Sequence, residues 1–363
     1  MKNFPVDLVY LWVDGNDPKW QEEKNDWMRR EKCVDQSTLA CRFIDNQELK
    51  YSLRSVLKFA PWINNIFIIT NGQVPEWLES TATSRVRIVK HNQIMPAMAL
   101  PTFNSEAIET CICNIPDLSE HFLLANDDYF FFKETRKSYF FTDDGRPIYR
   151  LVKHNWSEEK VCHNRYRRNI YYSAKLVEKL TGKFYRYESS HTFDPCRKSY
   201  FLDCRKVFEG EFEKTANRKF RTDDSVQKII LAYHALATGR AELIEVPKTG
   251  FYARNNLYIE LRTIEEAKDL LNYVQPFAFC LNDNEKTSVN VREQIKYFLA
   301  AIYPEKLNFE REVASMDGIS DCTSAKPFRK HWKYYLYSLL SKITLGRTRI
   351  KLKLKKWKYV KTE

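Results

Sequence analysis

The 363-residue sequence has few glycines, and none of them are clustered. Only nine are present, and no two lie within ten positions of each other. The G-x-G-x-x-G dinucleotide motif, the Walker phosphate loop and the G-x-S-x-G nucleophile elbow need glycines at most about five positions apart. No histidine is followed by another four positions later, which excludes the H-E-x-x-H zinc motif. The sequence therefore argues against classical NAD enzymes, P-loop NTPases, α/β-hydrolases and zincins.

Long apolar runs and paired cysteines are also missing. No apolar run approaches the length of about eighteen residues that a membrane-spanning helix needs, and residues 1–7 lack the apolar segment of a signal peptide. The nine cysteines form no C-x-x-C pair, so we expect reduced thiols and a reducing compartment. These absences predict a cytoplasmic protein.

Positive charge is concentrated at the C-terminal end. Residues 326–363 contain thirteen Lys and Arg and one acidic residue, so they account for the formal charge of +12 and leave the rest of the chain neutral. A neutral body argues against nucleic-acid binding. In the tail, Trp332, Leu336 and Leu340 follow helical spacing among basic residues, which predicts an amphipathic helix on an anionic membrane surface, at the inner face of the cell membrane. Packing of the tail on the body and contact with an anionic polymer are the alternatives.

Short apolar segments alternate with amphipathic ones in the first part of the chain. The pattern predicts strands at 8–13, 66–70, 86–89 and 121–125, and helices at 48–60 and 105–113. Such alternation is typical of an α/β fold with a mostly parallel sheet, here a Rossmann-like core of the nucleotide-sugar transferase type. Helical spacing at 226–237 and 264–273 predicts a helical second half. We divide the chain into an α/β half (1–140), a helical half (141–325) and the basic tail (326–363).

Polar residues follow three of the predicted strands. They are Asp14-Gly15-Asn16-Asp17, Asn71-Gly72 and Asn126-Asp127-Asp128, and a further polar group follows at 282–284. Ligands of parallel sheets bind at the carboxyl ends of strands, so these residues predict a binding site. Asp127 and Asp128 supply the hard oxygen ligands that Mg²⁺ or Mn²⁺ prefers, although two acids at a strand end are also common in solvated turns.

Three other residues have ordinary explanations when taken singly. His191 lies in a predicted loop, Arg221 precedes a predicted helix start that suits an anion, and Glu109 lies opposite the apolar face of its helix, where exposure to water is expected. Asp45 to Glu48 is similar to a helix capping box, with Asp45 as the cap.

Several blocks of the sequence resemble the Stealth proteins. This family includes bacterial capsular polysaccharide phosphotransferases and the lysosomal-enzyme N-acetylglucosamine-1-phosphotransferase of animals. The first block is VYLWVDGND at 9–17, and the second begins with RFIDNQELKYSLRS at 42–55 and continues to TNGQVP at 70–75. The others are 100–109 with 126–128, the looser 191–225, and CLNDN at 280–284.

The resemblance implies transfer of a sugar-1-phosphate from a nucleotide sugar, expected to be a UDP-sugar, to a hydroxyl of an acceptor oligo- or polysaccharide. The product would belong to a capsule or similar surface polymer. The family's essential residues fall on Glu109, Asp128, His191 and Arg221, with either Glu109 or His191 as the general base. The matching blocks imply substrate binding by Asp14, Gly15, Asp17, Arg42, Asp45, Asn46, Asn71, Gly72 and Asn104, and a metal, Mg²⁺ or Mn²⁺, on Asp127 and Asp128.

Two other function classes remain open at this point. A metal-dependent glycosyltransferase would use similar strand ends, but it would break the sugar–oxygen bond and form a glycosidic link. A non-catalytic protein that binds glycans or membranes would have no need for polar strand ends that converge. The identity of the released nucleotide separates the first class from the phosphotransferase.

Overall fold

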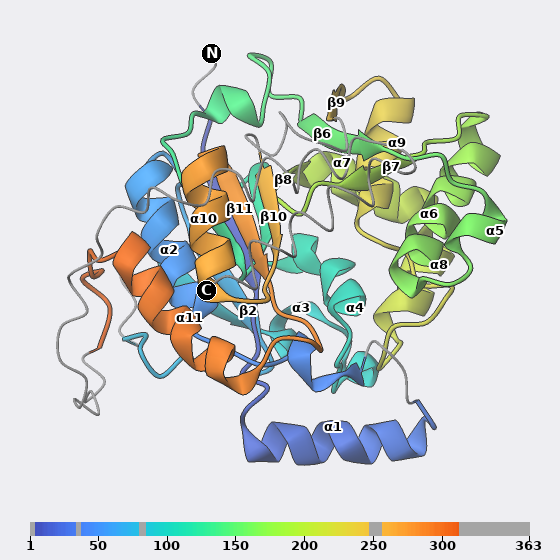
Figure 1. The fold of residues 1–363 in the computed structure, drawn as a ribbon. Helices are drawn as coiled ribbons and strands as arrows, with labels where there is room; N and C mark the ends of the chain where they lie inside the picture. Colours follow the sequence, from blue (N-terminus) through green and yellow to red (C-terminus); the bar gives the residue numbers. More distant parts are fainter. Residues whose placement is uncertain (1–3, 34–37, 80–84, 247–255, 312–363) are drawn as a thin grey trace, which may run out of the picture. The chain divides into compact units, whose positions relative to one another are not determined.

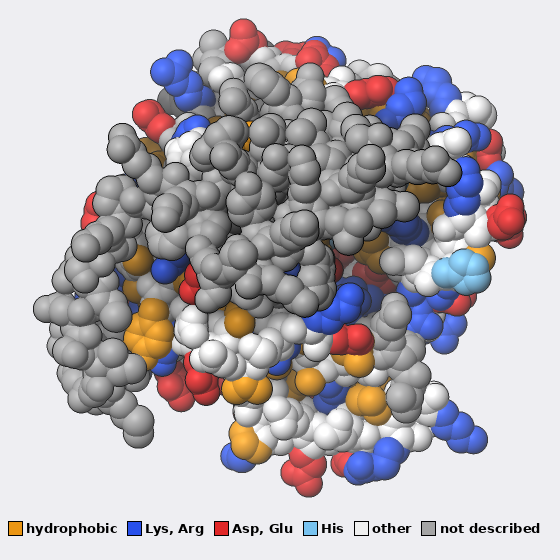
Figure 2. All heavy atoms as spheres, in the orientation of Figure 1, with side chains coloured by type: hydrophobic (Ala, Val, Ile, Leu, Met, Phe, Trp, Pro, Cys, Tyr) orange, Lys and Arg blue, Asp and Glu red, His pale blue; other side chains and the backbone are white. Residues whose placement is uncertain are grey.

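A computed structural model describes residues 4–33, 38–79, 85–246 and 256–311. Contacts group Met1–Val313 into one compact unit, and the following paragraphs concern this unit. The predicted tail helix lies outside the described residues. On the face drawn in Figure 2, basic and acidic side chains are interspersed, as expected of a neutral body.

A five-stranded sheet lies at the centre of the fold (Figure 1). Its strand order is β3-β2-β1-β4-β8, where the first four strands are parallel and β8 runs antiparallel to β4. The bounds are β1 Val6–Leu11, β2 Ile66–Thr70, β3 Val86–Lys90, β4 His121–Asn126 and β8 Asp194–Arg197. This arrangement confirms the prediction of a mixed α/β fold with a mostly parallel sheet.

The central strands are mainly apolar because both faces of the sheet are covered. Alternate residues point to opposite faces. Val9, Phe67 and Leu124 pack on one side, against helices from the second half of the chain. Leu8, Ile68 and Leu123 pack on the other, against the apolar face of helix α2, Glu48–Phe59.

Two smaller sheets accompany the central one. Their orders are β10-β11-β5 and β7-β6-β9, with bounds β5 Tyr129–Phe131, β6 Ile148–Lys153, β7 Tyr187–Ser189, β9 Glu242–Val246, β10 Asn256–Glu260 and β11 Ala278–Asn282. The second half therefore contains strands in addition to the predicted helices. Most of these strands are short and partly exposed, so they lack the continuous apolar pattern of β1 or β2.

The remaining helices surround these sheets. They are α1 Pro18–Arg30, α3 His91–Ile94, α4 Ser105–Glu109, α5 Glu158–Val161, α6 Arg165–Thr181, α7 Lys198–Val207, α8 Glu209–Ala216, α9 Ile229–Ala237, α10 Ile264–Val274 and α11 Val289–Ile302. Short 3₁₀ turns lie at Ala40–Arg42, Ala97–Ala99, Ile112–Asn114 and Lys137–Tyr139. In the described part of the chain, every helix is too short or too polar to cross a bilayer.

Two helix boundaries differ from the predictions. The helix expected at 105–113 ends at Glu109 and is followed by a 3₁₀ turn. Helix α9 begins at Ile229, well after the expected start near Arg221. The backbone N–H groups of Val226 and Gln227 donate to the hydroxyls of Thr215 and Ser173 at 2.9 and 3.0 Å. Because these bonds go to other helices, the segment before Ile229 is not helical, and Arg221 lies in a loop.

Candidate functional site

The predicted polar strand ends do converge. β1 pairs in parallel with both β2 and β4, so their carboxyl ends lie at the same edge of the sheet. Gln73, just after Asn71 and Gly72, connects two of these ends: its side-chain oxygen accepts from the backbone N–H of Asp14 at 3.0 Å, and its nitrogen donates to Asp17 at 3.0 Å. The polar groups of this edge therefore form one connected surface.

Gly15 brings a further loop to this edge. Its backbone N–H donates to the carbonyl of Phe43 at 2.8 Å. A Cβ atom at Gly15 would lie 2.0 Å from that carbonyl oxygen, so only glycine allows this approach. The contact places the segment containing Arg42, Asp45 and Asn46 beside β1, which supports the grouping of these residues in one site.

The capping box predicted at Asp45 is not formed as expected. Gln47, with a positive φ of 66°, is the residue before α2, and its backbone N–H donates to Asp45 at 3.0 Å. Glu48 turns back to accept from the backbone N–H of Asn46 at 2.6 Å and from its side chain at 2.7 Å. The αL conformation at Gln47 prevents the ordinary capping geometry and directs both carboxyl groups to the strand ends.

Four carboxyl groups with perturbed pKa values gather there: Asp45, Glu48, Asp127 and Asp128. Burial raises the pKa of Asp45 and of Asp128 to about 6. Burial also raises the pKa of Asp127 well above its usual range, and the charges of Asp128 and Asp45 raise it further. The pKa of Glu48 is raised by burial and by the neighbouring Asp45 and Asp127. This clustering of negative charge favours binding of a cation.

The β10-β11-β5 sheet completes the surroundings of Asp128. The thiol of Cys280 on β11 donates to Asp128 at 3.3 Å, and the backbone N–H of Leu281 donates to the carbonyl of Asp128 at 3.0 Å. The side chain of Asn46 lies 3.5 Å from Asp283. The polar group at 282–284 therefore reaches the same edge as the strand ends, although it comes from a different sheet.

Asp127 and Asp128 fit a divalent cation. Oδ1 of Asp128 is buried and hydrogen-bonds to no described residue, burial raises the pKa of both carboxyls, and repulsion from Asp128 and Asp45 raises the pKa of Asp127 further. Within the described ranges, no three His, Cys, Asp or Glu side chains converge in metal-ligand geometry. Mg²⁺ commonly uses one or two carboxylates and completes its coordination with water and substrate phosphates, so two protein ligands are sufficient.

Glu109 is buried, in contrast to the exposure expected from its helix position. It is 8% exposed, because α4 is covered on the side opposite its apolar face as well. Burial raises the pKa of Glu109 to about 7; Lys228 and Arg221 lower it, whereas Glu106 and Asp194 raise it. Oε2 of Glu109 finds no hydrogen-bond partner among the described residues. A carboxyl group with a free oxygen and a pKa near neutrality is suited to accept a proton.

Arg221 lies close to the same helix. Its guanidinium donates to the hydroxyl of Ser105 at 2.5 Å, and its charge lowers the pKa of Glu106 and of Glu109. Arg165 donates to the backbone carbonyl of Arg221 at 3.1 Å and pairs with Asp223 at 2.8 Å, which holds the loop in place. Arg221 is thus fixed beside Glu109 despite lying outside a helix.

His191 lies in a strained turn between two tyrosines. Its φ is +51°, and its ring is 5.9 Å from that of Tyr166 and 4.8 Å from that of Tyr258. The amide of Asn256 donates to the His191 carbonyl at 2.8 Å. Burial lowers the pKa of His191, so the imidazole is neutral at neutral pH. A non-glycine residue held at positive φ is a feature that clusters at functional sites.

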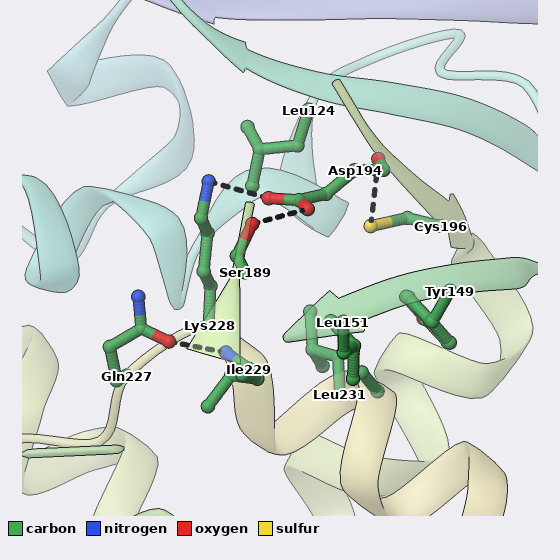
Figure 3. A pocket seen from close by; sticks show the side chains of 11 residues that line it. Leu124, Tyr149, Leu151, Ser189, Asp194, Cys196, Gln227, Lys228, Ile229 and Leu231 are labelled. Carbon is green, nitrogen blue, oxygen red and sulfur yellow. Dashed lines mark hydrogen bonds and ion pairs between the residues drawn. The ribbon is translucent and has the colours of Figure 1, made fainter. Parts of the chain in front are cut away.

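Sequence reasoning missed two charged residues of this region, Lys228 and Asp194. They form an ion pair at 2.8 Å (Figure 3). Their charges act on Glu109 and His191, and Lys228 also acts on Asp128. The sequence contained one indication of this pair, since a lysine directly before the apolar run at 229–232 is unusual.

The residues predicted to bind substrate occupy different environments. Asn71, Gly72 and Arg42 are exposed at the edge of the site. Asn104 is fully buried: its oxygen caps α4 by accepting from the backbone N–H of Glu106 at 3.0 Å, and its nitrogen donates to the carbonyl of Phe220 at 3.3 Å. In the structure Asn104 connects α4 to the segment before Arg221, and its contact with substrate stays a prediction.

This combination of a parallel sheet with carboxylates and basic side chains at its strand ends defines an α/β protein of the type that binds ligands at the sheet edge. The chain belongs to the Stealth family. Residues 4–32 match Stealth protein CR1, conserved region 1, and residues 42–149 match Stealth protein CR2, conserved region 2.

Relatives from several bacteria extend over most of the chain. The capsular polysaccharide phosphotransferase LcbA of Aeromonas hydrophila is 30% identical over 317 residues, which cover 84% of this chain and 85% of LcbA. The capsular polysaccharide phosphotransferase of Neisseria meningitidis serogroup B is 30% identical and covers 80% of each chain. The exopolysaccharide phosphotransferase CpsY of Mycobacterium leprae is 33% identical over 85% of this chain, which spans 57% of CpsY. As a member of this family, the chain is an enzyme of the transferase class.

A crystal structure of the galactosyltransferase LgtC with donor and acceptor sugar analogues is similar at a TM-score of 0.39 and 9% identity. The alignment covers 82% of this chain and 96% of LgtC. Because this score is low, the fold class rests on the strand order described above.

Proposed function

We propose that the protein transfers a sugar-1-phosphate from a nucleotide sugar, expected to be a UDP-sugar, to a hydroxyl of an acceptor glycan in capsular or surface polysaccharide synthesis. The observation that carries the proposal is that one largely buried cation, Lys228, acts on Asp128, Glu109 and His191, while Arg221 is bonded to Ser105 on the helix that carries Glu109. The names of the bacterial relatives support the same chemistry.

In this proposal, Asp127 and Asp128 would hold Mg²⁺ or Mn²⁺, and the bound ion would supply positive charge to neutralise the diphosphate of the donor. Asn71, Gly72 and Arg42 are exposed at the same edge and contact the nucleotide sugar. Arg221 donates to the oxygens of the phosphoryl group that is transferred, since a guanidinium makes bidentate contacts with phosphate. Phosphoryl transfer depends mainly on such positioning and charge stabilisation.

Glu109 is the proposed general base. Its pKa of about 7 is close to the operating pH, and one of its oxygens is free to accept the proton of the acceptor hydroxyl. His191, which is neutral, donates one ring N–H to a phosphate oxygen. The acceptor oxygen attacks the phosphorus attached to the sugar, and the bond from this phosphorus to the nucleoside monophosphate breaks.

The experiment that tests this function uses a panel of nucleotide sugars with an oligosaccharide acceptor. We expect release of a nucleoside monophosphate, and a rate at least about a hundredfold lower in His191→Ala and in Arg221→Ala. The exposed His163→Ala and Arg218→Ala variants serve as matched controls and retain the full rate. Release of a nucleoside diphosphate would instead favour a metal-dependent glycosyltransferase.

We also propose that residues 326–363 attach the enzyme to the anionic inner face of the cell membrane. The support is the concentration of thirteen basic residues in this segment. A lysine or arginine near an anionic leaflet contributes about 1 kcal/mol to binding.

A further inference from the structure

Lys228 and Asp194 form a charged pair next to the site but outside the set of family residues. Lys228 directly precedes α9, and Asp194 is the first residue of β8. Their charged atoms are 2.8 Å apart, and Ser189 donates its hydroxyl to the second oxygen of Asp194 at 3.1 Å. Figure 3 shows the two side chains extended toward each other, with Ser189 beside them.

On one side the pair faces a small, mainly apolar cavity. The side chains of Lys228 and Asp194 are only 11% and 17% exposed. Both line a cavity of about 20 Å³, large enough for a single water, whose other walls include Leu124, Leu151 and Ile229. Charges in such surroundings are weakly screened, so they act strongly on neighbouring groups.

The pair also lies close to the reacting groups. Asp194 pairs in the sheet with Leu124 of β4, the strand that ends at Asn126, two residues before Asp128. The charge of Lys228 acts on Asp128, Glu109 and His191. No other described cation acts on all three of these family residues.

The pair has its clearest electrostatic effect on the pKa of Glu109. After burial, Lys228 is the strongest influence on the pKa of Glu109 and lowers it, whereas Asp194 has a smaller, opposite influence. The charged and titratable groups that act on Glu109 come from α4, β8, the 221–228 segment and α6; they are Glu106, Asp194, Cys196, Arg221, Lys228 and Tyr166. Arg221 is expected to be engaged by substrate phosphate, which leaves Lys228 as the permanent counter-charge.

We propose that Lys228, held in place by Asp194, is a positioning residue of the transfer reaction, and that the charge of Lys228 keeps Glu109 in the ionised form that accepts the acceptor's proton. The inference rests on the proposed function. In the step concerned, the acceptor hydroxyl gives its proton to Glu109, its oxygen forms a bond to phosphorus, and the electron pair of the broken phosphorus–oxygen bond leaves with the nucleoside monophosphate.

Titration of carboxyl-labelled glutamate by ¹³C NMR tests the charge of Glu109 without any substrate. The Glu109 signal is the one with a midpoint near pH 7 that is missing from Glu109→Gln. We expect its midpoint to rise by at least about one pH unit in Lys228→Met, because the counter-charge is lost. In Asp194→Asn the midpoint falls, because Lys228 is no longer partly neutralised, and in Lys228→Arg it stays near the wild-type value.

The same variants are then compared in the pH profile of kcat/KM for transfer. The acidic limb is expected to move to higher pH in Lys228→Met and to lower pH in Asp194→Asn, as the NMR midpoints do. If the pair had only a structural role, the two variants would not move the limb in opposite directions. If Lys228→Met does not fold, Lys228→Met with Asp194→Asn removes both charges, and a smaller upward shift is expected.

The outcomes separate this inference from the proposed function. Equal midpoints in wild type, Lys228→Met and Asp194→Asn would overturn the role of the pair, whatever the activity. Shifted midpoints in a protein that releases no nucleoside monophosphate from any donor would leave the charge coupling intact, but would overturn both the proposed function and the link of the pair to transfer.

Discussion

At the scale of single residues, the site is built around carboxyl groups that are costly to ionise. Asp128 has a buried oxygen without a hydrogen-bond partner in the described part of the chain, and its pKa is raised to about 6 by burial. The Asp128→Asn substitution keeps the shape of the side chain but removes the charge that a hard cation needs. We expect loss of turnover with an unchanged fold, and the same loss when the wild-type enzyme is treated with EDTA. Asp117→Asn, at an exposed acid, is the matched control.

Glu109 makes the stability of the protein depend on pH. Its folded-state pKa of about 7 is above the usual value, so its contribution to stability is present below pH 4 and is lost as the pH rises through 7. We expect Glu109→Gln to be more stable than wild type by up to about 3 kcal/mol at pH 8, with little difference at pH 4. Urea unfolding at the two pH values measures this. A variant of an exposed acid, Glu22→Gln, changes little at either pH, and an equal effect of Glu109→Gln at both pH values would contradict the assignment.

At the scale of elements, the loop after β1 depends on one glycine. A Cβ at Gly15 would collide with the Phe43 carbonyl, whereas one at Gly210 in α8 would meet nothing within 4 Å. We therefore expect Gly15→Ala to destabilise the fold by more than about 1 kcal/mol and to reduce activity by displacing Asp45. Gly210→Ala is expected to be neutral or to stabilise by about 0.5–1 kcal/mol. Thermal unfolding of both variants gives the comparison, and equal melting temperatures would contradict this role of Gly15.

The bounds of a helix or strand could be predicted from the sequence best where both of its sides are buried. Strand β2 has the predicted bounds, Ile66–Thr70, because both sides of the central sheet are covered and the segment is apolar up to Ile69. The start of α9 was misplaced because hydrogen bonds from Val226 and Gln227 go to distant helices, which no local pattern reveals. The burial of Glu109 and its coupling to Lys228 also depend on packing between remote segments. The role of Glu109 could be expected from the motif match, but its burial and its neighbour Lys228 could not.

At the scale of the whole molecule, charge separates the body from the tail. Residues 326–363 hold the excess of positive charge, and they lie outside the described structure. We expect deletion of this segment to release the protein from vesicles that contain anionic lipid, while transfer to a water-soluble acceptor is kept. Co-sedimentation with anionic and neutral vesicles measures the effect. Unchanged binding of the truncated protein to anionic vesicles would contradict the anchor.

The central claim is that the acceptor attacks phosphorus and not the anomeric carbon of the sugar. ³¹P NMR of the purified product, with chromatography of the nucleotide released in the same reaction, tests it most directly. The account predicts a phosphodiester in the product, an anomeric configuration unchanged from the donor, and release of a nucleoside monophosphate, which is UMP from a uridine donor. A glycan without phosphorus, formed together with UDP, would contradict it.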